Sequence, residues 1–349
     1  MLDVRRLRLL RELALRGTIA AVAEALAFTP SAVSQQLSTL EREAGVPLLE
    51  RTGRRVVLTP AGHNLVRHAE AVLERLEQAA SELADTRQGL AGPLRIGTFP
   101  TAARAIVPAA LTTLARQHPG LEPMVSEIDP VCVADGIRVG ELDVALVHAY
   151  DFVPPLAEPG LESRPLCVES MFLASYVGAA SVSAAGAAAA ATAAGPGETV
   201  GRWRNAPWIT ATPGTLCHAM TIRACEAAGF TPRIRHQVDE FTTVLAMVAA
   251  GQGVALVPQL AVGDAPDGVA LTRLPMSRRT AVAFRSGSGG HPAIAAITAA
   301  LRGAVPEELR GTVPEEPRGT VPEEPRGTPE RDRHGAAPGE PPVTSVAHG

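Results

Sequence analysis

Residues 18–44 read TIAAVAEALAFTPSAVSQQLSTLEREA, and they predict two short helices separated by a tight break. Thr18 is a good N-cap for the first helix, in which apolar side chains recur at helical spacing. Thr29 and Pro30 then start the second helix. Threonine caps helices, and proline is best tolerated at the first helical position, where its missing amide hydrogen would have no partner. The stretch therefore predicts a helix-turn-helix.

The second helix separates an apolar face from a small, uncharged polar face. Its apolar residues recur at helical spacing and must face a core, while serine and glutamine occupy the opposite side. Glutamine can pair bidentately with adenine in the major groove, and serine can bond to bases or phosphates. This face suits a recognition helix that reads double-stranded DNA. We expect the DNA contacts to come from Thr29, Pro30, Ser31, Ser34, Gln35 and Ser38.

A basic hairpin, or wing, is predicted after the helix pair. Gly53 supplies a turn between two short extended runs within residues 49–58. The first 67 residues hold ten arginines against six acidic residues, although the whole chain has a net charge of -4. Such a local excess is typical of modules that neutralise DNA phosphates. We therefore add to the expected DNA-binding residues Arg51, Arg54, Arg55 and Thr59.

Residues 61–90 predict one long linker helix with an apolar seam. Apolar residues alternate in steps of four and three along it, as in a heptad repeat. Because the other faces are polar, the seam is most simply covered by the same helix of a second copy. Packing of the seam on its own domain is the alternative. The residues expected in a dimer contact are Leu65, Ala69, Val72, Leu76 and Leu83.

Residues 91–302 predict a two-lobed α/β domain, with the second lobe at about 166–265. Short apolar runs alternate with helical runs there, which indicates a parallel sheet. Open α/β folds bind ligands outside the carboxyl ends of their strands. In each lobe a threonine-rich segment follows a strand at that place, at residues 98–101 and 212–215.

Two kinds of ligand fit this crevice equally well on sequence grounds. Threonine hydroxyls and free amides at a helix start would hold a carboxylate or another polar group, whereas the two acids that end the second strand favour a cation. Each threonine could also be an ordinary N-cap. The expected effector-binding residues are Thr98, Phe99, Pro100, Thr101, Glu127, Asp129, Thr212, Thr215 and Pro258.

The order and spacing of these motifs resemble the LysR-type transcriptional regulators. In the first 62 residues the similar motifs are Ala23-Glu-Ala-Leu, Ser31-Ala-Val-Ser-Gln-Gln-Leu, Leu40-Glu-Arg-Glu-Ala-Gly-Val-Pro-Leu-Leu-Glu-Arg-Thr and Leu58-Thr-Pro-Ala-Gly. Further along they are Leu94-Arg-Ile-Gly-Thr, Gly140-Glu-Leu-Asp-Val-Ala, Ala227-Ala-Gly-Phe-Thr-Pro and Ala249-Ala-Gly-Gln-Gly-Val-Ala-Leu-Val-Pro. The resemblance implies a winged helix-turn-helix, a dimerising linker helix and an effector domain similar to periplasmic solute-binding proteins. Gln35 departs from the family, because many members carry arginine there.

Other classes of function find little support in the sequence. It contains no metal-ligand spacing, nucleotide loop or nucleophile elbow, so we expect neither an enzyme nor a cofactor. With no run of about 18 apolar residues, we expect a cytoplasmic protein without a membrane span. The four cysteines, among them Cys132 and Cys167, are predicted to be buried thiols. Cys217 and Cys225 offer a weaker alternative, a redox sensor, but they lie eight residues apart on one predicted helix, too far to form a disulfide.

Residues 303–349 carry an octad repeat that begins at Val305, Val313 and Val321. Each unit contains proline and glycine and few apolar residues, so we expect a disordered tail. The domain prediction is thus a DNA-binding domain at 1–60, then the linker helix, the effector domain and this tail.

Together the features predict a transcriptional regulator that binds operator DNA as a homodimer or homotetramer and responds to a small polar effector. RNA polymerase is a further candidate partner. A DNA-binding or architectural protein without an effector is the alternative.

Overall fold

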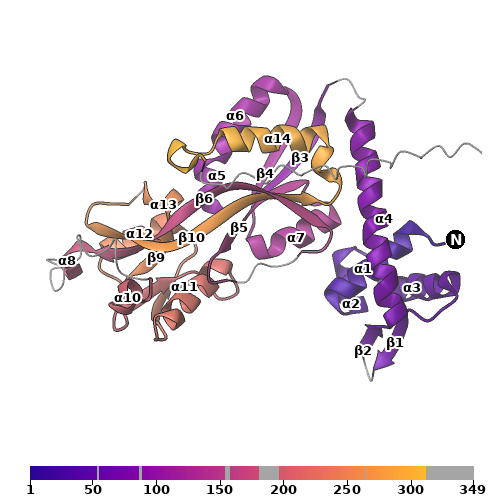
Figure 1. Ribbon diagram of the computed structural model, residues 1–349, viewed down its shortest axis with the longest axis horizontal. Coiled ribbons are helices and arrows are strands. Elements are labelled where there is room, and N and C mark those ends of the chain that lie inside the picture. Colours follow the sequence, from indigo (N-terminus) through magenta and orange to yellow (C-terminus); the bar gives the residue numbers. More distant parts are fainter. Residues whose placement is uncertain (53–54, 86–88, 154–157, 181–195, 264, 312–349) are drawn as a thin grey trace, which may run out of the picture. The chain divides into compact units, whose positions relative to one another are not determined.

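The structure is a computed structural model that describes residues 1–52, 55–85, 89–153, 158–180, 196–263 and 265–311. Its ribbon is drawn in Figure 1. The N-terminal domain contains α1 (Val4–Arg16), α2 (Ile19–Ala25), α3 (Pro30–Ala44), β1 (Leu49–Thr52) and β2 (Arg55–Leu58).

The predicted helix-turn-helix and hairpin are both present. Thr18 caps α2 by accepting from the amide of Ala21, and Thr29 caps α3 by accepting from the amide of Ala32. The two strands of the wing pair antiparallel. The apolar face of α3 is fully buried against α1 and α2, in a core that includes Leu10, Val22, Val33, Leu37 and Leu40.

The linker helix α4 (Pro60–Asp85) begins directly after the wing. Thr59 fixes this junction, because its hydroxyl donates to the carbonyl of Pro47 and accepts from the amide of Gly62. Gly62 permits a close approach, since a Cβ there would lie 2.3 Å from the carbonyl oxygen of Leu48. The N-terminal part of α4 therefore packs closely on the DNA-binding domain.

The effector domain is built on a six-stranded sheet of order β4-β3-β5-β10-β6-β9. The strands are β3 (Ala91–Thr98), β4 (Gly120–Glu127), β5 (Val144–Tyr150), β6 (Leu161–Tyr176), β9 (Ala255–Pro258) and β10 (Val269–Arg285). β3 runs parallel to β4 and β5, but β10 runs antiparallel to β5 and β6. The expectation of a parallel sheet is therefore correct for one half only.

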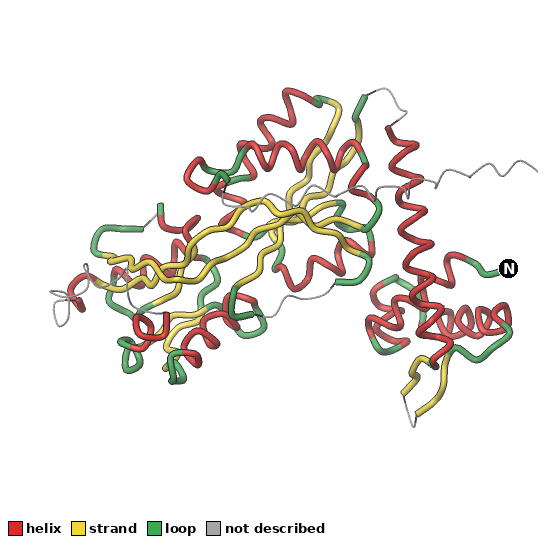
Figure 2. Tube along the Cα trace, in the orientation of Figure 1, coloured by secondary structure: helices red, strands yellow, loops and turns green. Residues whose placement is uncertain are grey.

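β6 and β10 are long strands that run through both lobes, as Figures 1 and 2 show. The sequence predicts two short strands in place of each, because polar residues interrupt their apolar runs. Register shifts in the β6–β10 pairing, between Leu274 and Ser277 and between Thr280 and Ala281, accommodate these irregular stretches without ending the strands.

Lobe I contains β3, β4 and β5 with α5 (Pro100–Ala105), α6 (Val107–Gln117), α7 (Pro130–Val139) and α14 (Pro292–Gly303). One helix is predicted at 102–117, but the chain breaks at Ile106, where φ is -120°. Pro108 explains the break, because it lacks the amide hydrogen that would continue α5. Helices α6 and α14 pack together on the sheet over the largest apolar core.

Lobe II contains β9 with β7 (Pro207–Thr210), β8 (Arg233–Gln237), α8 (Val177–Ala180), α10 (Pro196–Gly201), α11 (Leu216–Ala227), α12 (Phe241–Ala249) and α13 (Gln259–Val262). β7 pairs parallel with β8, and a bridge between Trp208 and Val254 leads toward β9. A strand before residue 212 is predicted without bounds, and β7 occupies that place, but the short helices α10 and α13 are missing from the prediction. Most of the Ala-rich segment 178–197 lies outside the described residues.

The effector domain continues beyond residue 302, where the prediction ended it. Val305 and Leu309 are 3% and 2% exposed and belong to the core of lobe I, and Leu309 is the last residue of a 3-10 turn, η3 (Glu307–Leu309). A second 3-10 turn, η2 (Ser288–Gly290), precedes α14. The first octad therefore packs on the domain, because its Val and Leu are both apolar. The later octads lie outside the described residues.

Among the residues that the structure describes, no helix is long and apolar enough to cross a membrane.

Candidate DNA-binding and effector-binding sites

The predicted reading face of α3 is open. Ser31, Ser34, Gln35 and Ser38 are all exposed, while Leu37 between them is buried. Uncharged donors and acceptors are thus presented together along one side of the helix, as a recognition helix requires.

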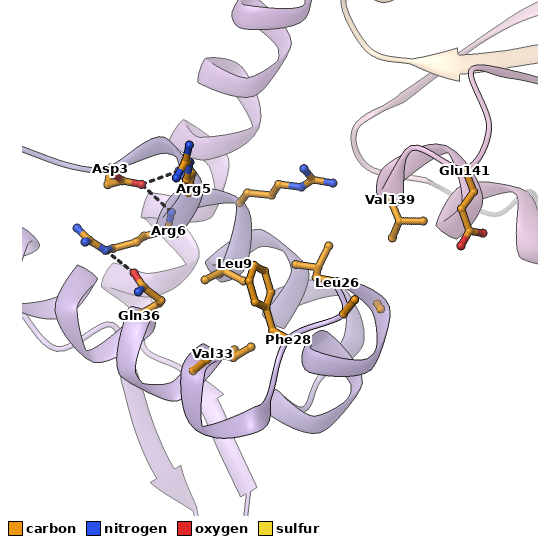
Figure 3. Close-up of a pocket in the computed structure, with 14 residues that line it drawn as sticks. Asp3, Arg5, Arg6, Leu9, Leu26, Phe28, Val33, Gln36, Val139 and Glu141 are labelled. Atoms are coloured by element: carbon orange, nitrogen blue, oxygen red, sulfur yellow. Dashed lines mark hydrogen bonds between the residues drawn. The ribbon is translucent and has the colours of Figure 1, made fainter. Parts of the chain in front are cut away.

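The neighbouring Gln36 points to another partner. Its Oε1 accepts from Nε of Arg6 at 2.9 Å, and Arg6 also forms an ion pair with Glu43. Figure 3 shows this bond, and in the same view Phe28, which is 56% exposed in the turn before α3, lies near Leu9 and Leu26. Gln35 and Gln36 therefore differ in surroundings although they are adjacent and chemically identical.

The remaining predicted DNA-binding residues differ in how the structure places them. Thr29 and Pro30 are exposed at the start of α3, but the hydroxyl of Thr29 already serves as its cap. The hydroxyl of Thr59 already makes the two hydrogen bonds at the start of α4 that are described above. Arg51 and Arg55 lie on the two strands of the wing, and Arg54 lies outside the described residues.

The apolar seam of α4 divides into two parts. Ala69 is 0% exposed in the core of the DNA-binding domain, and Leu65 packs against that core. The expected dimer contact at Ala69 is therefore wrong, because α1 already covers this half of the seam. The rest of the seam is uncovered, with 39%, 49% and 68% exposure at Val72, Leu76 and Leu83.

The threonines of lobe I do not act as helix caps. Thr98 and Thr101 are 0% and 2% exposed, and the N-cap of α5 is Phe99, which makes no side-chain capping bond. The hydroxyl of Thr101 accepts from Nη2 of Arg278 at 2.9 Å. The alternative role as N-caps thus fails for both residues. Pro100 lies next to them, exposed at the helix start.

The polar residues predicted in lobe II and at the end of β4 have mainly structural partners. Thr215 caps α11 by accepting from the amide of His218, and Thr212 bonds to Asp239. Asp129 caps α7. The further predicted residues are Glu127, exposed at the end of β4, and Pro258, buried at the end of β9.

A buried ion pair beneath Thr101 is absent from the sequence prediction. Nε of Arg278 on β10 donates to Oε1 of Glu169 on β6 at 2.6 Å, and both side chains are at most 1% exposed. Oε2 of Glu169 accepts from the amide of Leu260 in α13 at 2.8 Å. Burial by itself lowers the pKa of Arg278, but the adjacent Glu169 carboxylate outweighs it and raises that pKa, so the guanidinium stays charged. The guanidinium also lies over the ring of Phe99, 4.9 Å from its centroid.

Neutral polar groups complete the floor of the crevice. The hydroxyl of Tyr150 in lobe I lies 3.1 Å from Sγ of Cys217 in lobe II. Burial raises the pKa of both groups. Burial, reinforced by Arg278, lowers the pKa of His148 well below its usual value, so this imidazole is neutral. The buried guanidinium of Arg278 is thus matched by Glu169, and the other groups named in this paragraph carry no charge.

The cysteines do not form a disulfide in this structure, where all four are free thiols, and Cys132 is exposed, so the prediction of a buried thiol is wrong there. Cys217 and Cys225 lie on α11, about 12 Å apart along the helix axis at its standard rise. Burial raises the pKa of Cys225 to about 12, which makes it a poor nucleophile. Among the described residues there is also no cluster of ligands for a metal ion.

Known families match both halves of the chain. A family described as "Bacterial regulatory helix-turn-helix protein, lysR family" matches residues 4–63, and "LysR substrate binding domain" matches residues 87–306. The nitrogen assimilation regulatory protein of Klebsiella aerogenes is 30% identical over 268 residues, which are 74% of this chain and 79% of that protein. A "Probable hydrogen peroxide-inducible genes activator" of Mycobacterium avium is 29% identical over 276 residues, or 76% and 83% of the two chains.

A full-length OxyR variant from Pseudomonas aeruginosa has a similar fold. It aligns with a TM-score of 0.56 and 23% identity, over 91% of this chain and 99% of that chain. A winged helix-turn-helix followed by a two-lobed α/β domain defines a DNA-binding regulator with an effector domain. The chain belongs to the LysR family of bacterial transcription regulators, as the sequence motifs predict.

Proposed function

We propose that this regulator reads operator DNA through Ser31, Ser34, Gln35 and Ser38, and that a small polar effector enters the crevice at Thr98 and Thr101. The observation that carries the DNA half is the exposed, uncharged face of α3. The observation that carries the effector half is the hydroxyl of Thr101, which is buried in the first turn of α5 and accepts a hydrogen bond from Arg278. We also propose that the protein has no catalytic activity and acts in the cytoplasm, where its operator DNA lies.

Gln35→Ala tests the reading face. We expect it to lower discrimination among operator variants by about 1–3 kcal/mol, because a bidentate bond to one base would be lost. Binding-site selection with the full-length protein measures this. Gln36→Ala is the matched control, since it removes the same amide from a side chain that bonds to Arg6. An unchanged preferred sequence for Gln35→Ala would contradict the assignment.

The effector class follows from the charges in the crevice. Arg278 is paired with Glu169, and the pKa of His148 keeps its ring neutral. Among the described residues of the crevice floor named above, the charges are thus already paired, so a ligand charge buried beside them would bear its desolvation cost without a free counter-charge. We therefore propose an uncharged effector with at least one hydrogen-bond acceptor, which would bond beside the Thr101 hydroxyl.

Thr98→Val and Thr101→Val test the effector site. Each keeps the side-chain volume and removes one hydroxyl, so we expect a reduced effector response with little change in operator affinity. The effector is found by screening small polar metabolites for a rise in Tm, and reporter induction then gives the concentration for half response.

Thr112→Val is the control for this pair. Its hydroxyl is exposed on α6 and bonds only to the carbonyl of Pro108 in the helix turn before it. If the three valine variants respond to the effector as the unmodified protein does, the assignment of the crevice at β3 fails.

A further inference from the structure

An ion pair and a hydrogen bond join the two lobes at the rim of the crevice. Arg104 lies on α5 in lobe I, directly after the predicted effector-binding segment. Its Nη1 donates to the hydroxyl of Thr242 at 2.5 Å and lies 3.6 Å from Oε1 of Glu240. Both partners stand at the start of α12 in lobe II. The contact therefore spans from one lobe to the other.

Glu240 is held in place by its own helix. It is the N-cap of α12, and its Oε2 accepts from the amide of Thr243 at 2.7 Å. Its side chain is 44% exposed, and that of Arg104 is 40% exposed. Exposed ion pairs of this kind are weak and are screened by salt. Such a contact can break and form again readily while its two ends stay positioned.

The floor below this contact is closed. Thr98 and Thr101 are at most 2% exposed, and the bond between Tyr150 and Cys217 joins the lobes above the buried ion pair. A ligand cannot touch the hydroxyls of these threonines unless the lobes first separate. The strands β6 and β10 run through both lobes and keep them connected during such a motion.

We propose that Arg104, Glu240 and Thr242 form a crevice gate, which holds lobe II against lobe I and opens to admit the effector. This inference rests on the proposed function in one respect, that the crevice is the effector site. The gate acts by a charge contact at the rim. Its loss raises the fraction of time that the crevice floor is open and leaves the residues that contact the ligand unchanged.

Cys217 reports the opening without any effector. We would treat the full-length protein with iodoacetamide, an uncharged thiol reagent, and follow alkylation of each cysteine by peptide mass spectrometry. Cys132 is exposed and is replaced in all samples by Cys132→Ser. Cys217 is only partly buried, so it reacts at a basal rate in the closed crevice. Opening separates its Sγ from the Tyr150 hydroxyl and should add to that rate in proportion to the open fraction, when opening is fast compared with alkylation.

Arg104→Met and Glu240→Gln are each expected to raise the alkylation rate of Cys217 about two- to fivefold, as suits an exposed pair. The double variant should react no faster than the faster single variant, because both changes remove the same contact. Raising the salt concentration should raise the Cys217 alkylation rate of the unmodified protein toward the rates of the variants. Glu307→Gln is the control, since it breaks an exposed pair with Arg310 that does not join the lobes.

Two results would overturn the gate. In one, Arg104→Met alkylates Cys217 at the rate of Glu307→Gln. In the other, the buried Cys167 and Cys225 speed up together with Cys217, which indicates general loosening of the domain. The assay needs no ligand, so it stands apart from the proposed function. If the gate variants raise the alkylation rate of Cys217 but Tm screening finds no effector, the result counts against the effector site. If an effector response is found but the gate variants leave the alkylation rate of Cys217 unchanged, the result counts against the gate.

Discussion

Leu76→Glu is expected to convert the protein from dimer to monomer and to lower operator affinity by about 10²- to 10⁴-fold, the gain that two linked binding modules provide. Leu76 lies mid-way along the uncovered part of the α4 seam and is 49% exposed. In a dimer through this seam, the substitution would bury a carboxylate in an apolar contact and set it against the seam of the partner helix. Two half-sites would then no longer be bridged by one particle.

Sedimentation velocity and operator titration of the same samples measure both effects. Ala71→Glu is the matched control, because it adds the same charge at an exposed position of α4 about 100° or more around the helix from the seam. A Leu76→Glu protein that sediments as a dimer and binds its operator normally would contradict the linker-helix model.

Local signals explain why the DNA-binding domain could be predicted closely. The predicted start of α3 agrees with the structure, because Thr29 with Pro30 starts the helix. The helix ends at Ala44, the last residue of the predicted apolar face, before Gly45 at φ 70°. The open serine and glutamine face follows from helical periodicity alone. At Ala69 the same reasoning fails. Helical periodicity indicates that the seam is buried, but it does not indicate which apolar surface buries it.

Long-range pairing explains what the sequence could not predict in the effector domain. Glu169 and Arg278 are 109 residues apart in sequence, and each one alone looks like an interruption of an apolar strand. Only the pairing of β6 with β10 brings them together beneath Thr101. The gate has the same origin, because Arg104 and Thr242 come from different lobes and are 138 residues apart. A single sequence gives no signal for either contact.

The buried pair itself should have the largest effect on stability. Removing one member leaves the other as an uncompensated buried charge, so Arg278→Met is expected to lower the free energy of unfolding of the effector domain by about 3–5 kcal/mol. Adding Glu169→Leu to that variant should restore most of the loss, because two apolar side chains of similar size leave no charge to desolvate. The bond from Leu260 to Glu169 is also lost in the double variant, which limits the recovery.

Tryptophan fluorescence during urea unfolding, at one fixed protein concentration, measures this change in the free energy of unfolding of the effector domain. The chain has two tryptophans, and both Trp203 and Trp208 lie in lobe II. Arg279→Met is the control: Arg279 is the next residue along β10, its side chain is 50% exposed, and its ion pair with Asp151 should contribute only about 0–1 kcal/mol. If Arg278→Met cost no more than Arg279→Met, the buried pair would be unimportant to the stability of the crevice floor. The hydrogen bond from Arg278 to Thr101 would then have to be explained by effector binding alone.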